Sequence, residues 1–297
     1  MEGLPFKTRQ RYFLLLVFTF FCIVPLLTLY ASGYRLSRNF ELIKTGGVYI
    51  DVPVSGSSFY LNDELKGSGS LFQRNFFIQN LLPGTYMVRI EHDGFQDWRK
   101  EFTILPTFIA NGRAFLLPKD PELVSISPLL GRASATGTIP TGTQNTEYQN
   151  VVRYFNSGKM GVNALPLGAT TTILYNNASI TVRDRGDIGL WQDRRGSLHA
   201  HWLGSEERSP YFFCTIEGCV RDIIIAQGVG GIGHFDFLPE SNQFVIVEWK
   251  DGVFVTELDT RSPQNIQSLY PVPGATFRVI NQDIFILDGE QLFRVVI

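Results

Sequence analysis

Four histidines are the residues of this chain best suited to acid–base or metal chemistry: His92, His199, His201 and His234. A β-strand points residues two positions apart to the same side, as it would His199 and His201. His234 and Asp236 repeat that spacing, so the four side chains would form a metal site if their strands met. In the alternative, which we favour, each imidazole is solvated or hydrogen-bonded locally. We therefore predict no metal and no cofactor.

Other catalytic patterns are weak. The sequence contains no Gly-x-Ser-x-Gly elbow, and its carboxylate pairs stand in polar turns where solvation accounts for them. The tripeptide at 185–187, Arg-Gly-Asp, spells an adhesion motif but predicts a hairpin turn. The glycine-rich segment 228–233 leads into a strand, so it lacks the helix N-terminus of a phosphate site. The prediction is a non-enzymatic protein; the alternative is a hydrolase that uses Asp236, His234 or His201.

Two of the three cysteines are close in sequence. Cys214 and Cys219 form a C-x4-C pair around a short polar segment. In an oxidising compartment this spacing favours a disulfide across a tight turn, and two free thiols on neighbouring strands are the alternative. The third, Cys22, lies in a long apolar run.

That apolar run, residues 12–30, contains no charge and approaches the roughly 20 residues that a helix needs to cross a bilayer. Pro25 does not exclude such a helix, because proline is tolerated in membrane helices. Small residues at 31–33 raise the alternative of a cleaved signal peptide. The run exceeds the roughly 7 to 15 residues of a secretory core, so we predict a retained signal anchor over residues 12–32.

The flanks of the run predict its orientation. Lys7, Arg9 and Arg11 stand directly before it, and basic residues favour the cytoplasmic side. Residues 1–11 are therefore predicted to be a cytoplasmic tail, and everything after the helix to lie outside the cytoplasmic membrane. A polar juxtamembrane tether over 33–44 follows the helix.

Composition predicts the class of the remaining chain. The net charge is −2, and no basic run occurs beyond the membrane flank, so a nucleic-acid partner is not expected. Aromatic residues make up 13% of the chain, with 24 Phe, and helical periodicity is scarce after about residue 45. The fold class predicted is all-β with one N-terminal transmembrane helix.

The first β domain is predicted over residues 45–118. Turn residues separate runs rich in aromatic and β-branched residues, and Asn62-Asp63 closes one hairpin. The predicted strands are 48–52, 58–61, 76–78, 86–91 and 101–105.

This segment resembles the PEGA domain, a short β-sandwich of bacterial envelope proteins. The segments that carry the resemblance are 48–56, 59–62, Leu-Pro-Gly-Thr-Tyr with the strand after it at 82–90, and Gly-Phe-Gln-Asp-Trp at 94–98. The chain departs from the family at 66–70, where Lys-Gly-Ser-Gly-Ser replaces the usual Gly-x-Thr-Pro turn. The resemblance implies a small β-sandwich and a role in the cell envelope.

A linker or long loop is predicted over 119–147, because residues 131–147 are almost entirely small or polar. A β-propeller-like domain is predicted over 148–297. There, Gly196, Gly252 and Gly289 stand in similar strand–turn–strand contexts, at spacings that bracket the roughly 40 to 50 residues of a propeller blade.

The length of this domain supplies only about three blades, whereas propellers usually close with four to eight. The third strand of the last blade reaches the end of the sequence, so a strand from 123–127 or from 151–155 is expected to complete that blade. The alternatives are a partial propeller, a two-sheet sandwich, or an edge that pairs with a partner.

Together these features predict an anchored, extracytoplasmic binding or scaffold protein of the bacterial envelope. The membrane is contacted through residues 12–32, and cell-wall polysaccharide or another envelope protein is the expected partner. Trp191, Trp202 and Trp249 are the candidate binding aromatics, although each suits a protein core equally well.

Overall fold

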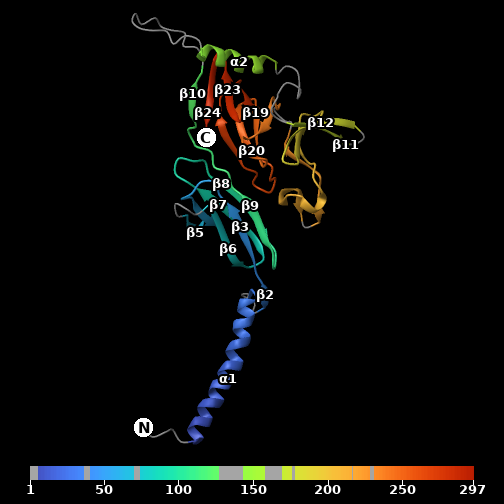
Figure 1. The fold of residues 1–297 in the computed structure, drawn as a ribbon. Coiled ribbons are helices and arrows are strands. Elements are labelled where there is room, and N and C mark those ends of the chain that lie inside the picture. Colours follow the sequence, from blue (N-terminus) through green and yellow to red (C-terminus); the bar gives the residue numbers. More distant parts are fainter. Residues whose placement is uncertain are drawn as a thin grey trace, which may run out of the picture. The chain divides into compact units, whose positions relative to one another are not determined.

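The computed structural model describes residues 6–36, 41–69, 74–126, 143–157, 169–175, 178–215, 217–227 and 231–297. The chain is mostly β, with one long apolar helix near its N-terminus (Figure 1). It divides into two compact units. The first comprises Met1–Arg89 with Glu101–Ala114, and the second Ile90–Lys100 with Phe115–Ile297.

The first helix, α1 (Phe6–Ala31), contains the predicted apolar run. Its segment Thr8–Ala31 has a mean hydropathy of 2.5, and none of it is buried inside the rest of the protein. Pro25 lies inside the helix without ending it. The expectation of an N-terminal helix long and apolar enough to span a membrane is therefore confirmed.

Two sheets follow in sequence, with the orders β6-β3-β9 and β5-β4-β7-β8, after a short hairpin β1-β2. The central strand β3 pairs antiparallel with β6 and parallel with β9. Val48, Ile50, Phe59 and Val88 are fully buried, as alternation on half-buried strands requires. The strands are β1 (Tyr34–Leu36), β2 (Leu42–Lys44), β3 (Gly46–Asp51), β4 (Ser58–Leu61), β5 (Glu64–Ser68), β6 (Asn75–Leu81), β7 (Gly84–Glu91), β8 (Trp98–Ile104) and β9 (Ile109–Arg113).

All five strands predicted in this segment are present, and the turn at Asn62-Asp63 has the positive φ angles, 50° and 63°, of a tight hairpin. Strands β5 and β9 were not predicted. Strand β5 is mostly exposed and polar, and β9 has the sequence Ile-Ala-Asn-Gly-Arg, so neither shows apolar alternation. Pairing with β4 and β3, respectively, makes them strands.

Three antiparallel sheets of four or five strands follow in the second unit. Their strand orders are β11-β12-β13-β14-β17, β18-β19-β20-β21 and β10-β24-β23-β22. The first set of strands is β10 (Glu122–Ser125), β11 (Ala169–Tyr175), β12 (Ala178–Arg185), β13 (Ile188–Gln192), β14 (Leu198–Trp202), β15 (Cys214–Thr215), β16 (Gly218–Cys219) and β17 (Asp222–Ala226). The second set is β18 (Phe235–Phe237), β19 (Phe244–Trp249), β20 (Gly252–Glu257), β21 (Ile266–Tyr270), β22 (Thr276–Ile280), β23 (Asp283–Asp288) and β24 (Gln291–Val296). Two short 3-10 helices, η2 (Glu206–Arg208) and η3 (Tyr211–Phe213), precede β15.

The predicted repeat is present in these sheets. Gly196, Gly252 and Gly289 stand at the turns of the hairpins β13-β14, β19-β20 and β23-β24, each of which joins two inner strands of its sheet. All three glycines have positive φ angles, of 83°, 134° and 58°. The turns therefore require the conformational freedom of glycine.

Strand β10 completes the last sheet. It pairs antiparallel with β24 from Glu122↔Val296 to Ser125↔Phe293, which confirms the expectation that a strand from about 123–127 fills this edge. The alternative segment, 151–155, was wrong as a strand because it lies within the helix α2 (Thr143–Ser157). Val151 and Phe155 are four positions apart, and α2 packs them together against the core of the last sheet.

Candidate functional site

A cluster of charged side chains lies on corresponding strands of the three sheets. Arg183 is on β12, Asp236 on β18 and Arg278 on β22, and each of these strands precedes the glycine hairpin of its sheet. The side chains of Arg183 and Asp236 are almost fully buried, and Arg183 Nε donates to Asp236 Oδ1 over 2.6 Å. This ion pair joins the first sheet to the second.

Burial shapes the electrostatics of Asp236. Removal from water raises the pKa of its carboxyl, and the positive charge of Arg183 and the hydrogen bond from the Phe237 backbone N–H oppose that rise. One carboxylate oxygen, Oδ1, accepts both of these hydrogen bonds. Within the described part of the chain, the other oxygen, Oδ2, is buried without a hydrogen-bond partner. The carboxylate is therefore held in place with half of its acceptor capacity unused.

His234 and Glu248 extend this cluster toward the third sheet. Burial and the charges of Arg278 and Arg183 lower the pKa of His234 to about 3, so its imidazole is neutral near pH 7. The ring lies 5.0 Å, centroid to centroid, from that of Phe277. Burial raises the pKa of Glu248, although a hydrogen bond from Thr276 opposes the rise.

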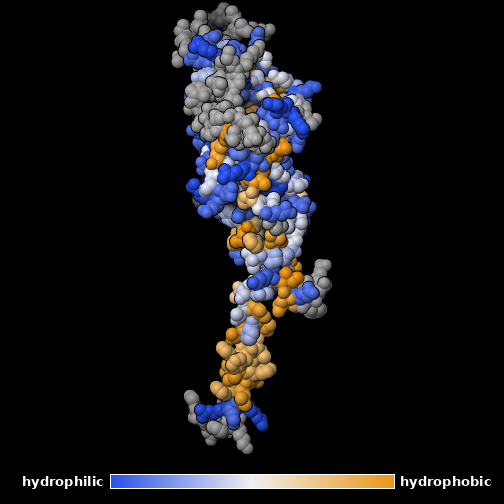
Figure 2. All heavy atoms as spheres, turned by 90° about the vertical axis from the view of Figure 1, so that its right-hand side faces the viewer, coloured by the Kyte–Doolittle hydropathy of each residue, from blue (hydrophilic) through white to orange (hydrophobic). Residues whose placement is uncertain are grey.

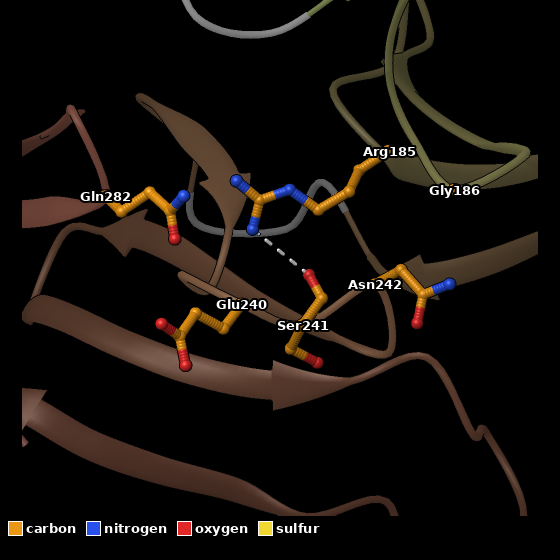
Figure 3. A pocket seen from close by; sticks show the side chains of 6 residues that line it. All are labelled: Arg185, Gly186, Glu240, Ser241, Asn242 and Gln282. Atoms are coloured by element: carbon orange, nitrogen blue, oxygen red, sulfur yellow. Dashed lines mark hydrogen bonds between the residues drawn. The ribbon is translucent and has the colours of Figure 1, made fainter.

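A pocket of about 340 Å³ lies at the tips of three hairpins, one from each sheet (Figure 3). Turn β12-β13, loop β18-β19 and turn β22-β23 contribute to its walls. Gly186 and Asp187 in the first turn have φ angles of 56° and 65°, and Asn281 and Gln282 in the third have 51° and 69°. These are two-residue turns, so the expectation of a hairpin turn at 185–187 is confirmed. The lining residues are Arg185, Gly186, Glu240, Ser241, Asn242 and Gln282.

The pocket is polar and carries both signs of charge. Arg185 Nη1 donates to the carbonyl oxygens of Leu238 at 2.8 Å and Ser241 at 3.3 Å, which fixes the guanidinium above the β18-β19 loop. The side chains of Gln282 and Glu240 lie around the same hollow (Figure 3). A cation, a carboxylate and amides suit a hydrogen-bonding ligand or the polar loop of another protein.

The structure separates the histidine pairs that the sequence analysis considered together. His199 Nδ1 lies 2.6 Å from Asp222 Oδ2, and His201 Nδ1 lies 3.2 Å from Asp222 Oδ1. Asp236 instead binds Arg183. Among the described residues, no group of His, Cys, Asp and Glu is arranged to hold a metal ion. In the described part of the chain, the four side chains of the metal-site alternative therefore do not gather into one such group.

The residues considered for a hydrolase also have separate partners in the structure. His201 shares Asp222 with His199, whereas Asp236 belongs to the ion cluster. The fourth histidine, His92, is partly exposed, and its Nδ1 lies 2.9 Å from the carbonyl oxygen of Asp93. Local hydrogen bonds thus occupy several of the candidate side chains.

The candidate binding aromatics are largely inside the second unit. Trp191 and Trp202 are only 5% and 6% exposed. Trp191 stacks on His199 with ring centroids 4.2 Å apart and donates to Asp222. Trp249 is partly buried and packs against the core of the first two sheets. Neither Trp191 nor Trp202 presents an open ring face to a ligand.

Cys214 and Cys219 are joined by a disulfide between β15 and β16, with an S–S distance of 1.99 Å. Cys22 is a free, exposed cysteine on α1.

The functional residues that the sequence analysis missed are the arginines. Arg278 interrupts a strand that is otherwise uncharged, which is the available signal for a buried charge. Arg183 gives no such signal, because it is the first of three charged residues that end β12. Their partners come from other sheets, however, and sequence spacing does not reveal which strands pack together. No protein-family model matches the chain, and no curated protein matches it significantly.

Proposed function

We propose that this chain is a non-enzymatic binding or scaffold protein of the bacterial cell envelope, anchored in the cytoplasmic membrane by α1. One observation carries the proposal: the apolar helix of membrane-spanning length is not buried inside the protein. A helix apolar all round needs an apolar surrounding, and a lipid bilayer supplies one. The N-terminus lies in the cytoplasm and both β units lie outside it, in keeping with Lys7, Arg9 and Arg11.

The finer architecture belongs to the same proposal. The sheets β6-β3-β9 and β5-β4-β7-β8 form a PEGA-like β-sandwich. The three sheets of the second unit form a partial propeller of three blades. Their glycine hairpins at matching places and the completion of the last sheet by β10 support this assignment, since propellers close their last blade in a similar way.

The pocket at the hairpin tips is the proposed contact surface for the partner. Arg185, Glu240 and Gln282 offer a fixed cation, a carboxylate and an amide within one hollow. Sugar hydroxyls, acetamido groups and the backbone of a protein loop each match these groups. Cell-wall polysaccharide or another envelope protein is accordingly the proposed partner class.

A sedimentation experiment tests this function. The full chain, purified in detergent, is mixed with isolated bacterial cell wall and compared with an Arg185→Ala, Gln282→Ala double variant. Arg194→Ala is the matched control, because Arg194 is an exposed arginine in the β13-β14 turn, at the other end of strand β13 from the pocket. We expect the parent and the control to sediment with the wall and the double variant to stay in solution. Sedimentation of all three proteins alike, or of none, would exclude the pocket as a cell-wall site.

A further inference from the structure

The joint between α1 and the first β unit is closed by backbone hydrogen bonds. Thr45 donates to the carbonyl oxygen of Gly33 twice, from its N–H at 3.0 Å and from Oγ1 at 2.8 Å. Thr107 N–H donates to Thr45 O at 2.9 Å, and Gly47 N–H donates to Phe108 O at 3.0 Å. The β8-β9 loop is thereby tied to Thr45 and Gly47, and Thr45 is in turn bonded to Gly33, two residues after the end of the helix.

Large apolar side chains stand exposed around this joint. The collar consists of Leu36, Leu42, Phe108 and Ile109, which are 59%, 56%, 65% and 50% exposed. Leu36 and Leu42 belong to the hairpin β1-β2, and the other two belong to the β8-β9 loop and the start of β9. Figure 2 shows hydrophobic surface beside the upper end of the helix as well as along it. An apolar cluster in water is costly, so its position next to a membrane helix requires an explanation.

The backbone of the loop adds a second observation. Thr107 has a φ angle of 67°, a conformation that β-branched residues rarely adopt. Such strain persists only where the surrounding structure imposes it, and it is concentrated at functional segments. Here the strained residue directly precedes Phe108, the most exposed member of the collar.

Polar anchors accompany the collar. Arg35 donates from Nη1 to the carbonyl oxygen of Tyr30 at 2.8 Å and from Nη2 to Asn80 Oδ1 at 2.7 Å. Its guanidinium also lies 3.7 Å from the centroid of the Tyr30 ring. Lys44, the last residue of β2, is exposed. Tyrosine and basic residues beside apolar ones are the composition of a membrane interface.

We propose that the collar inserts into the headgroup and upper acyl region of the leaflet in which α1 ends. The first β unit then rests on the lipid surface through Phe108, Ile109, Leu36 and Leu42. The inference rests on the proposed membrane anchor and adds to it a second, peripheral contact with the same bilayer. Continuity with α1 and the adjacent basic side chains favour lipid over a protein partner as the occupant.

Fluorescence quenching tests this contact in the full chain. Phe108→Trp is reconstituted into phosphatidylcholine vesicles with or without lipids brominated near the top of the acyl chain, and the parent protein supplies the background of native tryptophans. Arg74→Trp is the matched control. Arg74 is exposed and directly precedes β6, whose far end pairs Leu81 with Gly46 at the joint. The two sites are separated by roughly 20 Å of strand.

We expect brominated lipid to quench the added emission at least twofold for Phe108→Trp and to leave that of Arg74→Trp unchanged. Leu42→Trp, on the opposite segment of the collar, is expected to behave as Phe108→Trp does and covers the case in which one variant fails to fold. Resistance to alkaline extraction without quenching at either site would overturn the collar and leave the anchor standing. Quenching by aqueous iodide would place the collar in water, and shielding from both quenchers would place it under protein; either result overturns the inference. Failure to insert at all would overturn both the anchor and the collar.

Discussion

His234 provides a quantitative prediction about stability. Burial, together with the charges of Arg278 and Arg183, lowers the pKa of its imidazole from 6.5 to about 3 in the folded chain. An unfolded chain restores the ordinary value of 6.5. Between these two values the unfolded state binds more protons than the folded state, so acid favours unfolding. The contribution of neutral His234 is complete above pH 6.5 and is lost as the pH falls through this window.

The magnitude follows from the size of the shift. A pH of 5 lies about 1.5 units below the pKa of the imidazole in the unfolded chain, which is therefore almost fully protonated. The imidazole in the folded chain is still neutral at this pH. The free energy of unfolding should therefore fall by about 2 kcal/mol between pH 8 and pH 5 through this one residue. A His234→Gln variant keeps a polar side chain of similar size but does not titrate.

Urea unfolding at pH 8 and pH 5 measures the difference. The wild-type protein is expected to lose about 2 kcal/mol more than His234→Gln over this interval. His92→Gln, at a partly exposed position, is the control for the loss of a histidine side chain. An identical loss in the wild type and in His234→Gln would show that His234 is not buried beside the two arginines, and would refute the ion cluster as described.

Other positions give predictions of the same kind. Lys100 and Glu257 are buried within the second unit, with Nζ and Oε1 2.6 Å apart; Lys100→Met should cost about 3 to 5 kcal/mol in urea unfolding because it leaves the carboxylate unpaired. Adding Glu257→Gln should recover part of that loss, and a double variant less stable than Lys100→Met would contradict the pairing. Gly252→Ala meets the backbone of Tyr270 at a φ angle of 134°, whereas Gly289→Ala at 58° meets open space. Thermal unfolding should therefore show a loss of about 1 kcal/mol at Gly289 and at least about twice that at Gly252, and equal losses would argue against the close approach at Gly252.

Much of the local structure could be predicted from the sequence because local patterns determine it. The uncharged run forms α1, and alternation marks β3, β4 and β7. The three repeat glycines mark hairpins because only a positive φ angle closes those turns. Even the completion of the last sheet followed from its unfilled edge, although sequence alone left two candidate segments for it.

The candidate site was less predictable because distant segments build it. Arg183 is buried because β18 places Asp236 beside it, and the pocket exists because three turns from three sheets meet. Nothing in the local sequence of Arg183 identifies that partner. The tryptophans show that residue type alone can also mislead. Tryptophan often forms a platform for a ligand, but Trp191 is a buried core residue that stacks on His199.

Membrane topology is the central claim, and one experiment on bacterial cells that produce the full chain with a C-terminal tag tests it most directly. Membranes are washed with alkaline carbonate, and intact spheroplasts are treated with external protease. The account predicts that the tag stays with the membrane after the wash and that the protease removes it from intact spheroplasts. Release by alkali would contradict the anchor formed by α1, and a tag protected until the cells are lysed would contradict the placement of the β units outside the cytoplasm.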